Sequence, residues 1–256
     1  GWQICSTRIF AAGLFFLPLA IFHFTKIPFR KLHLIVLSGL LGNLFPAFLF
    51  AIAIKRINSS LAGILNSLTP LFVIVIGLAF FGTVVARRKI IGVLIGFAGL
   101  LIMNLSKGKV LLDDLSATLM ILLATIMYGV NVNLVSRYLR DINGIRMATV
   151  SLTLIAIPAG IVMWEHHVLD LWQYDQEARV AIGLAALLGV AGTAIATALF
   201  YVLIQKAGAV FASLVTYAIP VVAIFWGLLA HEHVTAIQVG CLALILGGVY
   251  LANSKR

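Results

Sequence analysis

Residues 59–82 read SSLAGILNSLTPLFVIVIGLAFFG, and this stretch determines the interpretation of the whole chain. It is apolar over about 20 residues, the length that crosses a bilayer, and it carries Pro70 near its middle. A similar stretch, ASLVTYAIPVVAIFWGLL, covers residues 212–229. Pro70 matches Pro220 and Gly77 matches Gly227 at one offset of 150 residues. The match predicts two copies of one membrane unit.

Composition excludes a soluble domain. Hydrophobic residues make up 62% of the 256 residues and charged residues only 10%, so there is too little polar surface to cover the apolar mass in water. The formal net charge of +10 comes from Lys and Arg near the ends of apolar segments, where such residues set membrane orientation. We therefore expect an all-α integral membrane protein with one transmembrane domain over residues 1–256 and no nucleic-acid partner.

Nine apolar segments are long enough, or nearly long enough, to cross a bilayer. They are Ile4–Phe22, Leu34–Ile54, Ser60–Phe81, Ile90–Leu105, Leu115–Val135, Met147–Trp164, Val180–Ile204, Ala207–Leu229 and Ile237–Ala252. The fourth and ninth segments are short, and each follows one of the proline-containing segments. The sequence therefore predicts nine transmembrane helices.

The repeat extends on both sides of the prolines. Upstream, Gly42 matches Gly192 at the same offset, and downstream Gly92 matches Gly240 at an offset of 148. These matches predict two halves, residues 1–106 and 115–256, in which the segment Leu115–Val135 has no partner in the first half. One interpretation is a ten-helix parent whose first helix is absent here, and the other is a natural nine-helix protein. We favour the first.

Loop charges predict the orientation in the membrane. Twelve cations follow the odd-numbered segments: Lys26, Arg30, Lys31, Arg87, Arg88, Lys89, Arg137, Arg140, Arg146, Lys206, Lys255 and Arg256. Five cations follow the even-numbered segments, together with seven acidic residues. The excess of positive charge places the first face, and the C-terminus, in the cytoplasm. Because each unit has an odd number of helices, the two halves are then inverted repeats, which is an architecture of transporters.

The end of each half carries the most specific pattern. Small residues, a mid-helix proline, a turn and a Gly-rich last helix follow one another, here from Ala212 through Pro220 to Glu232 and Gly240. This pattern resembles the EamA type of the drug/metabolite transporter superfamily, over nearly the whole chain. The resemblance implies ten helices in two inverted five-helix halves and transport of small metabolites. The first half departs from it, because residues 81–83 read FGT where the family often has a Glu.

Polar side chains within the apolar segments are the candidates for a substrate site, since an unpaired polar group facing lipid costs about 2 kcal/mol or more. The predicted substrate-binding residues are Asn43, Asn66, Thr69, Tyr128, Asn131, Thr193, Thr197, Ser213, Thr216 and Tyr217. They concentrate beside both prolines, which we expect to open the backbone toward a central cavity. The alternative is that these residues only hold helices together and that the prolines only kink them.

Other signals have weaker interpretations. Arg8 lies near the start of the first segment and resembles the family's arginine at the start of its second helix. We expect the Arg8 side chain to extend toward the membrane edge. The alternative is that Arg8 binds the substrate. Gly92 and Gly96 have the spacing of close helix packing. The histidines at 166–167 and in the sequence HEH at 231–233 lack a third ligand at helical spacing, so we expect no metal and no cofactor.

The function expected from these features is transport of small polar or amphipathic metabolites by alternating access around a central cavity, as an exporter or facilitator. The alternative is an intramembrane enzyme acting on a lipid-linked substrate, which would need a catalytic constellation at membrane depth that the sequence does not offer. No Asp or Glu lies in the core of a segment, so either the missing first helix holds a coupling carboxylate or the flux is not driven by protons. We expect a bacterial inner membrane location, a small-molecule substrate and lipid as partners, and either a monomer or a homodimer.

Overall fold

The computed structural model describes residues 1–57, 59–106, 114–229 and 235–254. Within these ranges, nine helical stretches are long and apolar enough to cross a membrane. They are Trp2–Phe24, Phe29–Ala53, Leu61–Phe80, Arg87–Leu105, Leu115–Tyr138, Gly144–Glu165, Gln176–Ala207, Ala209–Trp226 and Ala236–Asn253. The prediction of an all-α membrane protein with nine such helices is confirmed.

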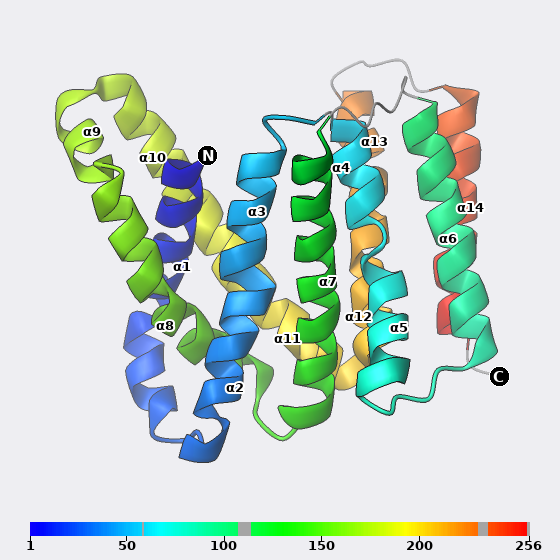
Figure 1. The fold of residues 1–256 in the computed structure, drawn as a ribbon, viewed down its shortest axis with the longest axis horizontal. Helices are drawn as coiled ribbons and strands as arrows, with labels where there is room; N and C mark the ends of the chain where they lie inside the picture. Colours follow the sequence, from blue (N-terminus) through cyan, green and yellow to red (C-terminus); the bar gives the residue numbers. More distant parts are fainter. Residues whose placement is uncertain (58, 107–113, 230–234, 255–256) are drawn as a thin grey trace. The chain divides into compact units, whose positions relative to one another are not determined.

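The helices pack into two compact units. Unit 1 contains Gly1–Ile52 and Leu134–Ala207, and unit 2 contains Ala53–Asn133 and Gly208–Arg256. Each unit draws on both predicted halves of the sequence, so the division by packing differs from the division into sequence halves. Figure 1 labels the α-helices used below.

Unit 1 is built around the pair α1 (Trp2–Phe24) and α8 (Gly144–Glu165). The two helices run antiparallel, because the Gln3 side chain donates to the carbonyl of His166 at 3.2 Å, whereas His23 pairs with Thr149 at 2.9 Å. Between these ends, the Thr153 hydroxyl donates to the carbonyl of Gly13 at 3.2 Å. A short helix that the sequence did not predict, α9 (Val168–Tyr174), follows α8.

Two long spans complete unit 1, and each is interrupted by a π-helical segment. The first span consists of α2 (Phe29–Gly39), η1 (Leu40–Leu44) and α3 (Phe45–Ala53). The other consists of α10 (Gln176–Leu188), η2 (Gly189–Ile195) and α11 (Ala196–Ala207). At the offset of 150, η1 corresponds to residues 190–194, which lie within η2. The backbone irregularity thus recurs at matched positions of the sequence repeat.

Unit 2 is built around the pair α6 (Arg87–Leu105) and α14 (Ala236–Asn253), which lie side by side (Figure 1). Glycines make this contact close. A Cβ built on Gly92 would lie 2.5 Å from the carbonyl oxygen of Gly248, and a Cβ on Gly248 would lie 2.6 Å from the amide nitrogen of Gly96. The prediction that Gly92 and Gly96 serve close helix packing is confirmed.

The proline-containing spans of unit 2 are also interrupted. One consists of α4 (Ser59–Asn66) and α5 (Thr69–Phe80), with turns at residues 67–68 between them. The other consists of α12 (Ala209–Ser213), the 3-10 segment η3 (Leu214–Ala218) and α13 (Ile219–Leu229). Residues 67–68 match residues 217–218 at the offset of 150. The remaining helix of unit 2 is α7 (Leu115–Tyr138), whose last residues belong to unit 1.

The Thr69 hydroxyl replaces the backbone N–H donor that Pro70 lacks. A proline has no backbone N–H, so the carbonyl four residues earlier, that of Asn66, loses its usual donor. The Thr69 hydroxyl donates to this carbonyl at 2.7 Å. Ser67 makes a similar bond to the carbonyl of Ile64 at 2.6 Å. The break in the helix therefore leaves these two carbonyls satisfied within the protein, as a membrane interior requires.

Candidate functional site

A polar stripe runs along η2 and α11 in unit 1. Thr193, Thr197 and Tyr201 are spaced four residues apart, so they share one face of the span. The Thr197 hydroxyl donates to the side-chain oxygen of Asn43 at 3.0 Å. The Tyr201 hydroxyl lies 2.9 Å from the hydroxyl of Ser38. The stripe is therefore joined to α2 and η1 by side-chain hydrogen bonds.

Thr193 differs from the other members of the stripe. Its side chain is 4% exposed, and its hydroxyl oxygen is buried without a hydrogen-bond partner. At the offset of 150, Thr193 corresponds to Asn43, so each π-helical segment of unit 1 carries one polar residue at the same position. π-Helical segments occur preferentially at functional sites, because they re-aim side chains and free backbone groups.

In unit 2, the predicted residues beside the two breaks are Asn66 and Thr216, which also correspond at the offset of 150. Both are half-buried, whereas Thr69, Ser213 and Tyr217 are buried. The two proline-containing spans are in contact, since α5 packs against both α12 and η3. Unit 2 therefore offers two partly accessible polar side chains on contacting spans.

The other predicted residues on these spans bond to backbone. The Ser213 hydroxyl donates to the carbonyl of Val210 at 2.7 Å, in the same helix. Tyr217 is 0% exposed, and its hydroxyl donates to the carbonyl of Val93 on α6 at 3.1 Å. These bonds, like that of Thr69, give the side chain a structural role that is independent of any substrate.

Two predicted residues lie on α7. Tyr128 is half-buried, and Asn131 is 2% exposed. Their neighbour Asn133 donates to the carbonyls of Val73 and Gly129, both at 2.9 Å, and so links α7 to α5. The ten predicted residues thus fall into two sets, Asn43, Thr193 and Thr197 in unit 1 and the other seven in unit 2. That the two sets form one cavity stays a prediction.

Sequence reasoning missed several buried hydroxyls of unit 1. Ser38 pairs with Tyr201, and the hydroxyls of Thr7 and Ser151 are buried without a partner. Ser151 lies where α8 meets α2, because a Cβ built on Gly39 would lie 2.5 Å from its hydroxyl oxygen. Serine and threonine occur widely in membrane helices, so their presence alone did not distinguish these positions.

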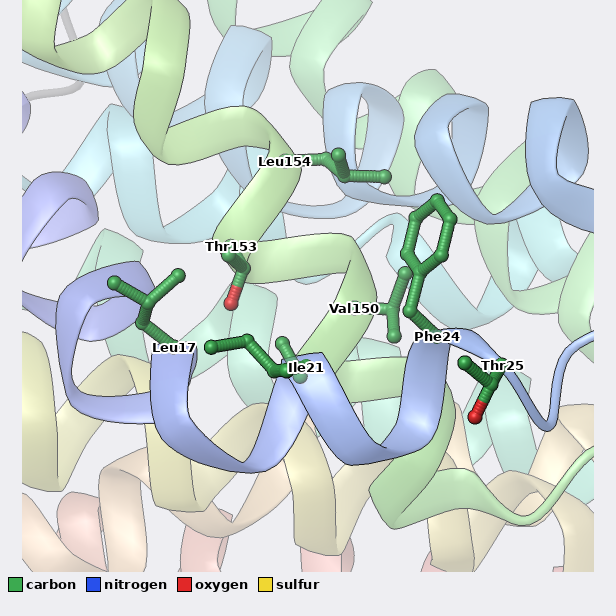
Figure 2. Close-up of a pocket in the computed structure, with 8 residues that line it drawn as sticks. Leu17, Ile21, Phe24, Thr25, Val150, Thr153 and Leu154 are labelled. Atoms are coloured by element: carbon green, nitrogen blue, oxygen red, sulfur yellow. The ribbon is translucent and has the colours of Figure 1, made fainter.

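A groove between α1 and α8 is apolar and does not contain the predicted residues. It has a volume of about 330 Å³, and Leu17, Ile21 and Phe24 line it from the side of α1 (Figure 2). Its two hydroxyls are already engaged, since Thr153 donates to Gly13 and Thr25 donates to the carbonyl of Phe22. A second groove is also apolar, and it is lined by Phe10, Ile157, Gly160, Ile161, Met163, Trp164 and Leu169. A polar solute would find no free hydroxyl donor in the first groove.

Ion pairs lie at the ends of the helices. The Lys31 ammonium donates to the carboxylate of Asp141 and to the carbonyl of Tyr138, the last residue of α7. The hydrogen bond from Lys31 lowers the pKa of Asp141 below its ordinary value. In the loop before α7, a hydrogen bond from the Ser116 hydroxyl lowers the pKa of Asp114 in the same way. Both carboxyls are therefore charged at neutral pH.

Within the described ranges, no three His, Cys, Asp or Glu side chains lie close enough to hold a metal ion. The sequence HEH at 231–233 lies outside these ranges, and so does Glu232, on which the family resemblance partly rests. The expectation of no metal and no cofactor stays a prediction.

The nine helices long and apolar enough to cross a membrane, within the described ranges, define a polytopic membrane protein. The model of the EamA-like transporter family matches residues 2–105 and 115–254, and the chain belongs to this family. The family and the relatives described below point to a membrane transporter of small molecules and not to an enzyme. The resemblance seen in the sequence is confirmed.

The chain is also similar to two curated proteins and to one solved structure. An uncharacterized transporter of Archaeoglobus fulgidus is 23% identical over 255 residues, which cover 99% of this chain and 88% of the relative. A WAT1-related protein of Arabidopsis thaliana is 33% identical over 115 residues, which cover 41% of this chain but only 32% of the relative. A crystal structure with 16% identity matches with a TM-score of 0.73 over 98% of this chain and 86% of its own, and it supports the fold.

Proposed function

We propose that this transporter carries small polar or amphipathic metabolites by alternating access, as an exporter or facilitator. The observation that carries the proposal is the recurrence of irregular backbone at matched positions. The π-helical segments η1 and η2 hold Asn43 and Thr193. In the proline-containing spans, Asn66 directly precedes the break at residues 67–68, and Thr216 lies in η3. Interrupted helices in matched positions of two repeats are typical of transporter binding sites.

The repeat itself supports the proposal. The family model matches two successive stretches of the chain, residues 2–105 and 115–254, which coincide closely with the predicted halves. Repeat-related helices also pack against each other, since α1 pairs with α8 and α6 pairs with α14. With the charge bias of the loops, we infer that the halves are inverted and that the C-terminus is cytoplasmic.

The chemistry of the polar groups suggests the kind of solute. Amide and hydroxyl side chains both donate and accept hydrogen bonds, so Asn66 and Thr216 suit a molecule with several polar groups. Among the described residues, all Asp and Glu side chains lie in loops or near helix ends. A bare metal cation would therefore lack carboxylate ligands in the membrane interior.

The test is flux in proteoliposomes with a panel of labelled metabolites. Asn66→Leu and Thr216→Val are expected to reduce uptake to the level of protein-free liposomes without a large change in melting temperature. Ser67→Ala is the matched control, because the neighbouring Ser67 hydroxyl bonds to the backbone carbonyl of Ile64. The proposal fails if the first two variants transport at the parental rate, or if the control loses flux equally while remaining folded.

A further inference from the structure

The polar stripe of unit 1 begins close to Arg8 of α1. A Cβ built on Gly189, the first residue of η2, would lie 3.1 Å from the Cα of Arg8 and closer still to its carbonyl oxygen. Only a glycine allows the two backbones to approach this closely. Thr193 lies four residues beyond Gly189, on the same face of the span. The stripe that continues through Thr197 and Tyr201 therefore begins beside the α1 segment that contains Arg8.

The donors at this end of the stripe are unpaired. The Nε atom of Arg8 is buried without a hydrogen-bond partner, and none of the ion pairs among the described residues involves Arg8. The hydroxyls of Thr7, which is 5% exposed, and of Thr193, which is 4% exposed, are also buried without partners. Further along the stripe, Thr197 and Tyr201 have partners. The stripe member nearest Gly189 in sequence, Thr193, and the adjacent α1 residues Thr7 and Arg8 thus each have a buried donor without a partner.

Arg8 is half-buried, and the buried Nε–H of its guanidinium needs an acceptor. A guanidinium can only donate hydrogen bonds, and burying it unpaired in a membrane protein is costly. Extension of the guanidinium toward the membrane edge would place its terminal nitrogens in water, but the buried Nε–H would still lack an acceptor. A hydroxyl can donate to the same acceptor, so a guanidinium and two hydroxyls together suit a negatively charged oxygen.

We propose that Arg8, Thr7 and Thr193 form a binding site for an oxyanion, such as the carboxylate or phosphate group of a transported molecule. The proposal rests on the proposed transport function and narrows the substrate class to solutes that carry an anionic group. The phosphate of an anionic lipid offers the same chemistry, and the experiment separates this source from a soluble one. The site lies wholly within unit 1.

The experiment measures binding without transport, on the full chain in nanodiscs of neutral lipid. The probes are acetate, benzoate and inorganic phosphate, with benzamide as the neutral analogue of benzoate. A second set of nanodiscs contains phosphatidylglycerol in place of the soluble anions. The readouts are the unfolding midpoint and the affinity from its dependence on probe concentration.

We expect at least one soluble anion or phosphatidylglycerol to raise the midpoint, and benzamide to leave it unchanged. Arg8→Gln should weaken the binding of that anion by about 10- to 100-fold, because a charge-assisted hydrogen bond is lost. Arg8→Lys keeps the charge and should bind more weakly than the parent but more tightly than Arg8→Gln. Thr193→Val should also bind more weakly. A response to soluble anions identifies a solute site, and a response to phosphatidylglycerol alone identifies a lipid site.

Arg179→Gln is the matched control, because Arg179 is an exposed arginine of the same unit that donates to the carbonyls of Trp172 and Gln173. It should respond to anions like the parent. Without any anion, Arg8→Gln should unfold at the parental midpoint or above it, since it removes a guanidinium whose buried Nε–H has no hydrogen-bond partner. Anion binding that is equal in the parent and Arg8→Gln, or the absence of any anion response, would overturn the proposal. Either result would leave the transport of neutral solutes untouched.

Discussion

At the scale of single residues, Tyr217 and Gly96 depend on each other. A Cβ built on Gly96 would lie 2.5 Å from a ring carbon of Tyr217, so the glycine provides the space that the ring occupies. The Tyr217 hydroxyl then reaches the carbonyl of Val93. A polar side chain that the sequence placed in a substrate site is thereby used to pack η3 against α6.

Tyr217→Phe should lower the free energy of unfolding by about 1–3 kcal/mol, because the carbonyl of Val93 loses its buried donor. Thermal unfolding in detergent measures the change, with Thr216→Val, a half-buried neighbour, as the control that should remain near the parental stability. A Tyr217→Phe protein of unchanged stability but without flux would show that the hydroxyl contacts the substrate instead.

The carboxyl group of Asp141 predicts how stability changes with pH. The hydrogen bond from Lys31 lowers the pKa of Asp141 below 3.8, so its contribution to stability is present above this pH and is lost as the pH falls toward the lowered pKa. The carboxylate is 62% exposed, which limits the contribution to less than about 1 kcal/mol. Asp141→Asn should therefore lower the melting temperature slightly at pH 5–7, and the difference from the parent should shrink below pH 4. A difference that grows in acid would contradict this assignment.

At the scale of helices, the contact between α6 and α14 depends on one of two adjacent glycines. A Cβ on Gly248 would lie 2.5 Å from the carbonyl oxygen of Gly92, whereas a Cβ on Gly247 would meet nothing within 4 Å. Gly248→Ala should destabilise the protein by about 1–3 kcal/mol through overpacking. Gly247→Ala should be neutral or stabilising by up to about 1 kcal/mol, since alanine favours helix. Equal melting temperatures of the two variants would argue against the glycine contact.

The spans could be predicted from the sequence, but their π-helical interruptions could not. Apolar runs and loop charges indicate each span directly, because the bilayer sets the length of a helix. A π-helical segment needs one extra residue in a turn, and Leu40–Leu44 reads like any other apolar helix. Pro70 and Pro220 did predict irregular backbone, because a proline cannot supply the N–H of a regular helix.

The candidate site was predicted less completely, for the same physical reason. Polarity identified Asn66 and Tyr217 equally, yet only tertiary packing shows that Tyr217 is buried against Gly96 while Asn66 is partly accessible. The Arg8 site depends on the contact between Arg8 and Gly189, residues far apart in the sequence. The spacing of polar residues gives the face of one helix, whereas a site needs the faces of several.

At the scale of the whole molecule, the orientation in the membrane can be tested by labelling. In a background of Cys5→Ala and Cys241→Ala, a cysteine is introduced at Arg88 or at Gln173, both of which are exposed. An impermeant thiol reagent added to intact cells should label the cysteine at position 173 and spare that at position 88, because the cation-rich face lies inside. Labelling in the opposite sense would reverse the orientation.

Alternating access is the central claim, and the accessibility of position 66 tests it most directly. In the same cysteine-free background, Asn66→Cys is reconstituted in liposomes, and an impermeant thiol reagent is applied from one side or the other. We predict modification from both sides, with added substrate or anion changing the two rates in opposite directions as one conformation gains population. A cysteine at position 66 that reacts from one side only, whatever solute is present, would contradict transport by alternating access around this residue.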